Sequence, residues 1–228
     1  MQESFDEERE ILKWIAIVTM TIDHTGAALY PEHMALRFIG RLSFPLFGYL
    51  LVLGVESTRS LKNYLIRLLL FAFISQVPFY LAVGKEPLNP LNILVTLSLG
   101  VLTIHSLRTT NPLLILIPLF ASVVLNFDYG IYGLIAISCI YLLTIETKLG
   151  VISLVLLNFA FLLLGSPYQI LSLFALPFIL AHKRGFQFKV RNVDRKTVYP
   201  LWRKYLFYVY YPLHLTVLYL IKAYYWFY

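Results

Sequence analysis

Residues 12–31 read LKWIAIVTMTIDHTGAALYP, an apolar run of the length that crosses a lipid bilayer. A transmembrane helix needs about 20 mainly apolar residues to cross about 30 Å of hydrocarbon. The run nevertheless carries Asp23 and His24 well inside its ends. Because ionisable side chains are costly in hydrocarbon, this stretch predicts both a membrane helix and part of a functional site.

The composition of the whole chain agrees with this prediction. Hydrophobic residues make up 59% of the 228 residues and charged residues 14%, and the mean hydropathy is +0.74. Soluble domains carry about 25% charged residues, so an ordinary soluble enzyme and a disordered chain are excluded. The net charge of +7 is spread between apolar runs, which argues against nucleic-acid binding. The lone Cys139 provides neither a disulfide framework nor a thiolate metal site, and no metal is expected.

The apolar segments predict one all-α domain over residues 1–228, a polytopic transmembrane helix bundle of about nine spans. The two weakest segments, 112–126 and 167–181, are short enough to be tilted or re-entrant. The predicted spans are 12–31, 36–55, 62–83, 91–107, 112–126, 129–145, 149–165, 167–181 and 201–223.

The distribution of basic residues predicts that the N-terminus lies on the inner, cytosolic side of the membrane, which we expect to be a bacterial inner membrane. With that orientation 15 of the 19 Lys and Arg residues lie inside and 4 outside, an alternation that an odd number of spans preserves. The connection 182–204 holds eight basic residues and Asp194, and we expect it to face the cytosol, against anionic lipid or an anionic ligand. The acidic start MQESFDEERE does not resemble a signal peptide.

Polar groups from six elements are predicted at one level, in the outer half of the bilayer. Each group alone also has a structural interpretation: a helix-packing hydrogen bond for Gln76 or Asn92, a turn for Asp128, a packed polar side chain for His214. Together they predict a cavity that opens to the extracytoplasmic side. The candidate catalytic residues are His24, Asp23, Arg41, His214, Gln76, Asn92 and Asp128.

Arg41 is expected to interact with Asp23. Arg37 and Arg41 are four residues apart and share a helix face, and Pro45 should kink the helix at the carbonyl of Arg41. Arg41 either neutralises Asp23 or binds a carbonyl of a substrate. Because neighbouring residues cannot easily bond side chain to side chain, Asp23 is expected to contact Arg41 or His214 and to leave His24 free as a general base.

A second cluster is predicted at the inner side, where Arg59, Asn63 and Arg67 are spaced four residues apart. Such a stripe either holds phosphate groups or consists of snorkelling side chains that fix the topology.

The candidate catalytic residues in the outer half of the bilayer permit acyl transfer, because that reaction requires a base and hydrogen-bond donors for an oxyanion. Proton-coupled transport uses the same residue types, and an assembly subunit would need them only for helix packing. These three functions stay open on the residues alone.

Several stretches resemble the TraX family of integral membrane proteins, which is named for a conjugal-transfer protein that acetylates the N-terminus of pilin. The first are LKWIAIVTMTIDHTGAALYP and LRFIGRLSFPLFGYLLVLGVESTRSLKNYLIRLLLFAFISQVPF, followed by LNILVTLSLG, DYGIYG and FYVYYPLHL. They occur in order over nearly the whole chain. The first two carry most of the specificity.

The resemblance implies a membrane acyltransferase that takes an acyl group from cytosolic acetyl-CoA and delivers it to an acceptor on the far side. It implies Asp23 and His24 from IDHTG, Arg41 from GRLSFPLF and His214 from YYPLH as site residues. It assigns Arg59, Asn63 and Arg67 from STRSLKNYLIR to the coenzyme. The acceptor implied is an amine or hydroxyl of a glycan, a peptide N-terminus or a small amine, and the other partner is the lipid bilayer.

Overall fold

The computed structural model describes residues 7–84, 86–109, 111–185 and 201–227. Every regular element in these ranges is a helix, and the only β pairing is two isolated bridges, which confirms the all-α prediction. The helices are α1 (Glu7–Leu29), α2 (Met34–Gly40), α3 (Ser43–Ser57), α4 (Leu61–Val83), α5 (Ile93–Thr109), α6 (Pro112–Val124), α7 (Gly130–Ile145), α8 (Thr147–Leu163), the 3₁₀ helix η1 (Pro167–Ala175), α9 (Leu176–Lys183) and α10 (Leu201–Phe227).

Three segments are long and apolar enough to cross a membrane by length and composition: Met34–Ser57, Leu61–Val83 and Tyr205–Tyr225. Four shorter apolar helices accompany them, at Ile93–Thr109, Leu113–Val124, Gly130–Ile145 and Thr147–Leu163. α1 has the length of a span, but its polar residues lower its hydropathy. The number of nine spans and the side of the N-terminus stay predictions.

The structure differs from the predicted spans in three places. The predicted span 36–55 is broken between Gly40 and Ser43, which confirms the kink expected from Pro45. The segment predicted as the span 167–181 is not one α-helix, because η1 occupies its first half and α9 its second. The predicted loop 182–204 is shorter, because α9 extends to Lys183 and α10 begins at Leu201, and its residues 186–200 lie outside the described residues.

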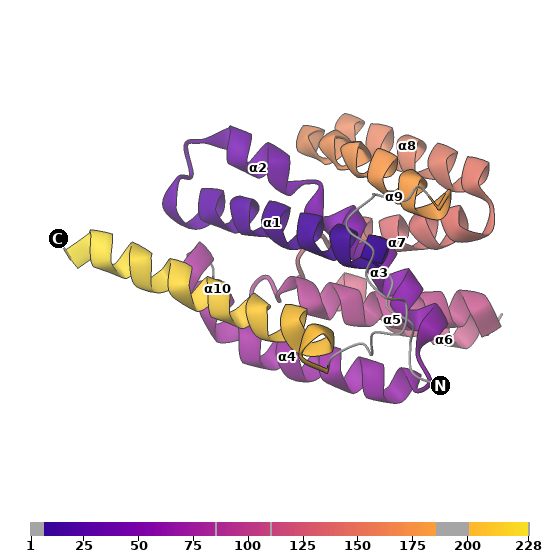
Figure 1. The fold of residues 1–228 in the computed structure, drawn as a ribbon, viewed down its shortest axis with the longest axis horizontal. Helices are drawn as coiled ribbons and strands as arrows, with labels where there is room; N and C mark the ends of the chain where they lie inside the picture. Colours follow the sequence, from indigo (N-terminus) through magenta and orange to yellow (C-terminus); the bar gives the residue numbers. More distant parts are fainter. Residues whose placement is uncertain (1–6, 85, 110, 186–200, 228) are drawn as a thin grey trace.

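α3 and α5 form the centre of the bundle, with ten buried residues each. α10 lies along α4, α7 lies along α8, and α1 packs against α2, α3 and α10 (Figure 1). The outer helices expose large apolar side chains, such as Phe73 on α4 at 83%, Val123 on α6 at 85% and Leu163 on α8 at 86%. Such surfaces are typical of helices that face lipid.

Candidate functional site

The contact between α1 and α10 brings together two buried histidines. His24 Nδ1 lies 2.7 Å from His214 Nε2, and the two rings stack with centroids 5.1 Å apart and planes 13° apart. His24 is 8% exposed and His214 6%. The prediction that His24 stays free of side-chain partners is therefore wrong, because its imidazole binds the other predicted histidine.

The hydrogen bonds of this pair determine where its protons lie. His214 Nδ1 is 2.9 Å from the backbone carbonyl of Tyr210, which can only accept, so Nδ1 carries the proton. In the neutral ring His214 Nε2 is then an acceptor, and His24 Nδ1 must donate to it. This assignment leaves His24 Nε2 without a proton. No described residue hydrogen-bonds to it, so it is the basic nitrogen of the pair.

Tyr210 and Thr21 hold the histidine pair from one side. The Tyr210 ring stacks on His214 with centroids 5.0 Å apart and planes 9° apart. The Tyr210 hydroxyl lies 2.7 Å from Thr21 Oγ1, and Thr21 donates its own proton to the carbonyl of Ile17. Tyr210 must therefore donate to Thr21, which fixes the ring that supports His214. Neither Tyr210 nor Thr21 was predicted from the sequence, although both lie in stretches that resemble the TraX family.

Asp23 points away from the histidines and toward α2. Its Oδ2 lies 2.6 Å from Arg37 Nη1, which also donates to the Asp23 carbonyl at 3.1 Å. The expected contact of Asp23 with Arg41 or His214 is therefore wrong: Arg37, one turn earlier on the same face, forms the ion pair. Successive helix positions differ by about 100°, so Asp23 and His24 face different helices. Gly40 makes the contact possible, because a Cβ there would overlap the Asp23 carboxylate.

Arg41 lies at the break between α2 and α3 and faces the loop before α7. Its guanidinium carbon is 5.8 Å from the centre of the Tyr129 ring. Arg41 Nε is buried without a hydrogen-bond partner, and so is the second carboxylate oxygen of Asp23. The arginine is thus held by ring stacking and charge, with one donor left unused.

Asp128 completes this cluster from the loop between α6 and α7. The backbone N–H of Asp128 donates to the carbonyl of Leu91 at 2.8 Å, and the Thr96 hydroxyl donates to the backbone carbonyl of Asp128. The pKa of the Asp128 carboxyl is raised to about 6, first by loss of solvation and then by the nearby charge of Asp23, while Arg41 and Arg37 oppose the shift. The structure therefore brings together five of the predicted residues: Asp23, His24, Arg41, Asp128 and His214.

Gln76 and Asn92 form a separate clamp between α4 and the start of α5. Gln76 Nε2 donates to the carbonyls of Pro87 and Pro90, at 3.0 and 3.2 Å. Asn92 Nδ2 donates to the Ala72 carbonyl at 2.7 Å and to Gln76 Oε1 at 2.8 Å. All amide protons of both side chains are used within the protein, so neither has a donor left for a substrate carbonyl in this conformation.

The inner stripe lies at the N-terminal end of α4. Arg59 and Asn63 are exposed, and the backbone N–H of Asn63 donates to the N-cap Ser60. Arg67 is half-buried, with its guanidinium carbon 5.7 Å from the centre of the Tyr64 ring. In the described part of the chain, neither Asn63 nor Arg67 hydrogen-bonds to a residue of the cluster around His24.

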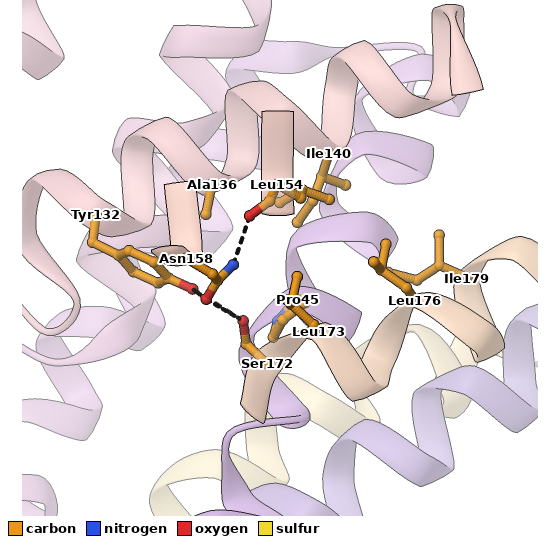
Figure 2. A pocket seen from close by; sticks show the side chains of 10 residues that line it. All are labelled: Pro45, Tyr132, Ala136, Ile140, Leu154, Asn158, Ser172, Leu173, Leu176 and Ile179. Carbon is orange, nitrogen blue, oxygen red and sulfur yellow. Dashed lines mark hydrogen bonds between the residues drawn. The ribbon is translucent and has the colours of Figure 1, made fainter. Parts of the chain in front are cut away.

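A third polar group, unpredicted by the sequence analysis, joins α7, α8 and η1 (Figure 2). Ser172 Oγ donates to Asn158 Oδ1 at 3.0 Å, and the Tyr132 hydroxyl reaches the same oxygen at 3.2 Å. The group borders a small cavity of about 10 Å³, otherwise lined by apolar side chains and by none of the predicted site residues. The available signal was Asn158 itself, a lone amide in the apolar run SLVLLNFAFLL.

Comparisons with known proteins identify the family of the chain. The family model described as TraX protein matches residues 8–222. "Probable fimbrial assembly protein FimC, serogroup H1" of Dichelobacter nodosus is 31% identical over 96% of this chain and 97% of its own length. An uncharacterized protein of Rickettsia prowazekii is 31% identical over 45% of this chain and 38% of its own. No solved structure matches the chain. Since the family model covers nearly all of the sequence, the protein belongs to the TraX family of membrane proteins.

Proposed function

We propose that this protein is a membrane component in the assembly of a fimbrial or pilus-like surface fibre. The observation that carries the proposal is similarity over nearly the full length to a protein named for fimbrial assembly. The apolar helical bundle supports a place in the membrane. In the simplest form of this function the buried polar residues only hold the helices together.

A second candidate, favoured by the histidine pair, is that the protein contributes to assembly by acyl transfer from acetyl-CoA. His24 Nε2 is an unprotonated imidazole nitrogen whose tautomer is set by His214 and the Tyr210 carbonyl. A general base needs an unprotonated nitrogen that is held in a fixed tautomer, and the pair supplies one. The acceptor in this proposal is an amine or hydroxyl, and the N-terminal amine of a fibre subunit fits the assembly role.

The remaining residues take proposed roles around this base. Arg41 would orient the acyl carbonyl with its unused Nε–H, and Asp128 would accept a hydrogen bond from the neutral acceptor amine whose proton His24 takes. Gln76 and Asn92 would position α4 and α5 rather than touch the substrate. The exposed cations at the start of α4, with Arg59 first, fit the phosphates of a coenzyme that arrives from the cytosol.

The test measures fibre assembly and acetyl transfer with the same variants. Membranes containing wild type, His24→Ala or the exposed control His33→Ala are incubated with radiolabelled acetyl-CoA and purified fibre subunit. Surface fibres are counted in cells that lack the native gene and carry each variant. Acyl transfer as part of assembly predicts that His24→Ala loses at least 10²-fold in transfer and loses fibres, whereas His33→Ala keeps both.

The outcomes separate the two candidates. Fibre loss in the deletion strain with full rescue by His24→Ala would favour an assembly subunit without catalysis. Normal fibres in the deletion strain would overturn the assembly role. An Arg59→Ala, Arg67→Ala double variant that binds acetyl-CoA as well as wild type in calorimetry would remove the proposed donor site.

A further inference from the structure

Three buried polar atoms, in the charged cluster of Asp23 and Arg41 and on Tyr211 beside the histidine pair, form no hydrogen bond of good geometry among the described residues. They are Asp23 Oδ1, Arg41 Nε and the hydroxyl of Tyr211. They come from α1, from the break between α2 and α3, and from α10. Buried polar groups are normally paired, and leaving one unpaired costs stability. Three such atoms around one base indicate a place that a polar ligand completes.

Tyr211 lies against both imidazoles of the pair. Its ring centre is 5.9 Å from that of His24, with planes 61° apart, and 5.6 Å from that of His214, with planes 58° apart. The side chain is fully buried, at 0% exposure. The groups that act on its hydroxyl are Asp128, the backbone N–H of Ile93, Tyr129 and Asp23, so the hydroxyl lies toward the charged cluster. The Ile93 N–H can only donate, so the proton of the hydroxyl stays without an acceptor.

The adjacent Tyr210 provides a contrast on the same helix. Its hydroxyl is occupied by Thr21, and its carbonyl is occupied by His214. The proton of the Tyr211 hydroxyl has no acceptor, although its ring is the more deeply buried of the two. A hydroxyl needed only for packing would be expected to find a partner or to be replaced by a hydrogen atom, as in phenylalanine.

We propose that the Tyr211 hydroxyl is the oxyanion donor of acyl transfer, an inference that rests on the proposed acetyl-CoA-dependent function. His24 Nε2 takes a proton from the acceptor amine or hydroxyl, whose lone pair forms a bond to the acyl carbon. The carbonyl electron pair moves to oxygen, which accepts the Tyr211 proton in a hydrogen bond, with Arg41 Nε as the second donor. The intermediate collapses, the carbon–sulfur bond breaks, and the proton on His24 passes to the coenzyme thiolate.

The other candidate donors are already used. Gln76 and Asn92, which the sequence offered for this role, donate all their amide protons to carbonyls of the protein. Arg37 is engaged with Asp23. Tyr211 is therefore the hydroxyl donor left beside the base in the part of the chain that the structure describes, and it must donate where charge develops to be effective.

Tyr211→Phe tests this role because it removes only the hydroxyl. The matched control is Tyr132→Phe, which removes a buried hydroxyl bound to Asn158 and Ser172 away from the histidines. With purified protein and subunit we expect Tyr211→Phe to lower kcat by about 10²-fold, to leave the KM for acetyl-CoA within threefold, and to keep its thermal midpoint. Tyr132→Phe should show the reverse pattern, with a lower midpoint and a kcat within threefold.

The outcomes distinguish the inference from the function beneath it. No acetyl transfer by wild type would overturn the acyltransferase proposal and the Tyr211 role with it. Transfer by wild type with equal kcat for Tyr211→Phe would overturn the Tyr211 role alone.

If Tyr211→Phe fails to fold, Tyr211→3,5-difluorotyrosine replaces it. The fluorinated phenol loses its proton at lower pH, so the alkaline limb of the kcat profile should move to lower pH by at least one unit. An unchanged profile would overturn the proposal.

Discussion

Two kinds of polar group are buried in this bundle, and they differ in how completely they are paired. In the clamp of Gln76 and Asn92, every amide proton reaches an acceptor within the protein. In the cluster around His24, a carboxylate oxygen, a guanidinium N–H and a phenol form no hydrogen bond of good geometry among the described residues. Paired networks stabilise a fold, whereas unpaired buried groups cost stability and persist where a ligand or a reaction needs them. Unpaired atoms also occur singly elsewhere, at Arg67 Nε, Ser75 Oγ and Gln169 Oε1, so it is their concentration around one cluster that indicates residues open to a ligand.

The largest effect is expected when the orienting histidine is removed. His214→Phe keeps a ring in the stack but removes the acceptor for His24 Nδ1, so the His24 imidazole is no longer held with Nε2 unprotonated. We expect acetyl transfer per folded molecule to fall by about 10²–10³-fold, and the thermal midpoint to fall because the His24 Nδ1–H is left unpaired. Single-turnover assays with purified protein measure the first quantity and a thermal shift the second. A variant with normal transfer would show that the pair serves packing alone.

The clamp should respond in the opposite way. Asn92→Leu removes the side-chain donor to the Ala72 carbonyl and the side-chain acceptor of the Leu94 N–H, while the backbone N–H of residue 92 still donates to Gln76 Oε1. We expect the free energy of unfolding to fall by about 3 kcal/mol, because buried groups are left unpaired. Transfer per folded molecule should stay within a few-fold of wild type. Denaturant titration in detergent measures the stability. Loss of transfer in a fully folded variant would return Asn92 to the reaction centre.

Much of the fold and the core of the site could be predicted because hydrocarbon makes polar residues conspicuous. Asp23 and His24 interrupt an apolar run, His214 does the same near the end of the chain, and Pro45 marks the break after Gly40. Each of these signals is local, so one sequence is enough to detect it.

The partners within the site could not be predicted in the same way. Arg37 and Arg41 share a face of one helix, and which of them meets Asp23 depends on how far α2 slides along α1. The sequence could not single out Tyr210 and Tyr211 as site residues, because the chain has 17 tyrosines and an aromatic residue in a membrane helix does not by itself indicate a site. Only the packing of α1 against α10 distinguishes a bonded phenol from an unpaired one.

Asp128 provides an intermediate test, because its effect depends on pH. Its pKa in the folded protein is raised to about 6, from 3.8, mainly by loss of solvation. Because the pKa is raised in the folded protein, the contribution of Asp128 to stability is most favourable below pH 3.8, where the carboxyl is protonated in both the folded and the unfolded state. That contribution is lost as pH rises through about 6, because the buried carboxyl then becomes charged. Asp128→Asn should therefore match wild type near pH 4 and exceed it by about 1 kcal/mol above pH 7. Thermal midpoints across this range measure the difference, and a gap independent of pH would contradict the shift.

The smallest effect is expected in the network of Tyr132, Asn158 and Ser172. Ser172→Ala removes one of the two hydroxyls that reach Asn158 Oδ1, but the Tyr132 hydroxyl still lies 3.2 Å from that oxygen. The neighbouring cavity of about 10 Å³ has room for about one water molecule, which can take the place of the lost hydroxyl. We therefore expect a loss of about 1 kcal/mol in the free energy of unfolding, with unchanged transfer. Asn158→Leu is the matched comparison, because it leaves both hydroxyls without their shared acceptor and should cost more than twice as much. Equal losses in the free energy of unfolding for the two variants would mean that the hydrogen bonds of this network are not all formed. That result would weaken the distinction between paired and unpaired polar groups.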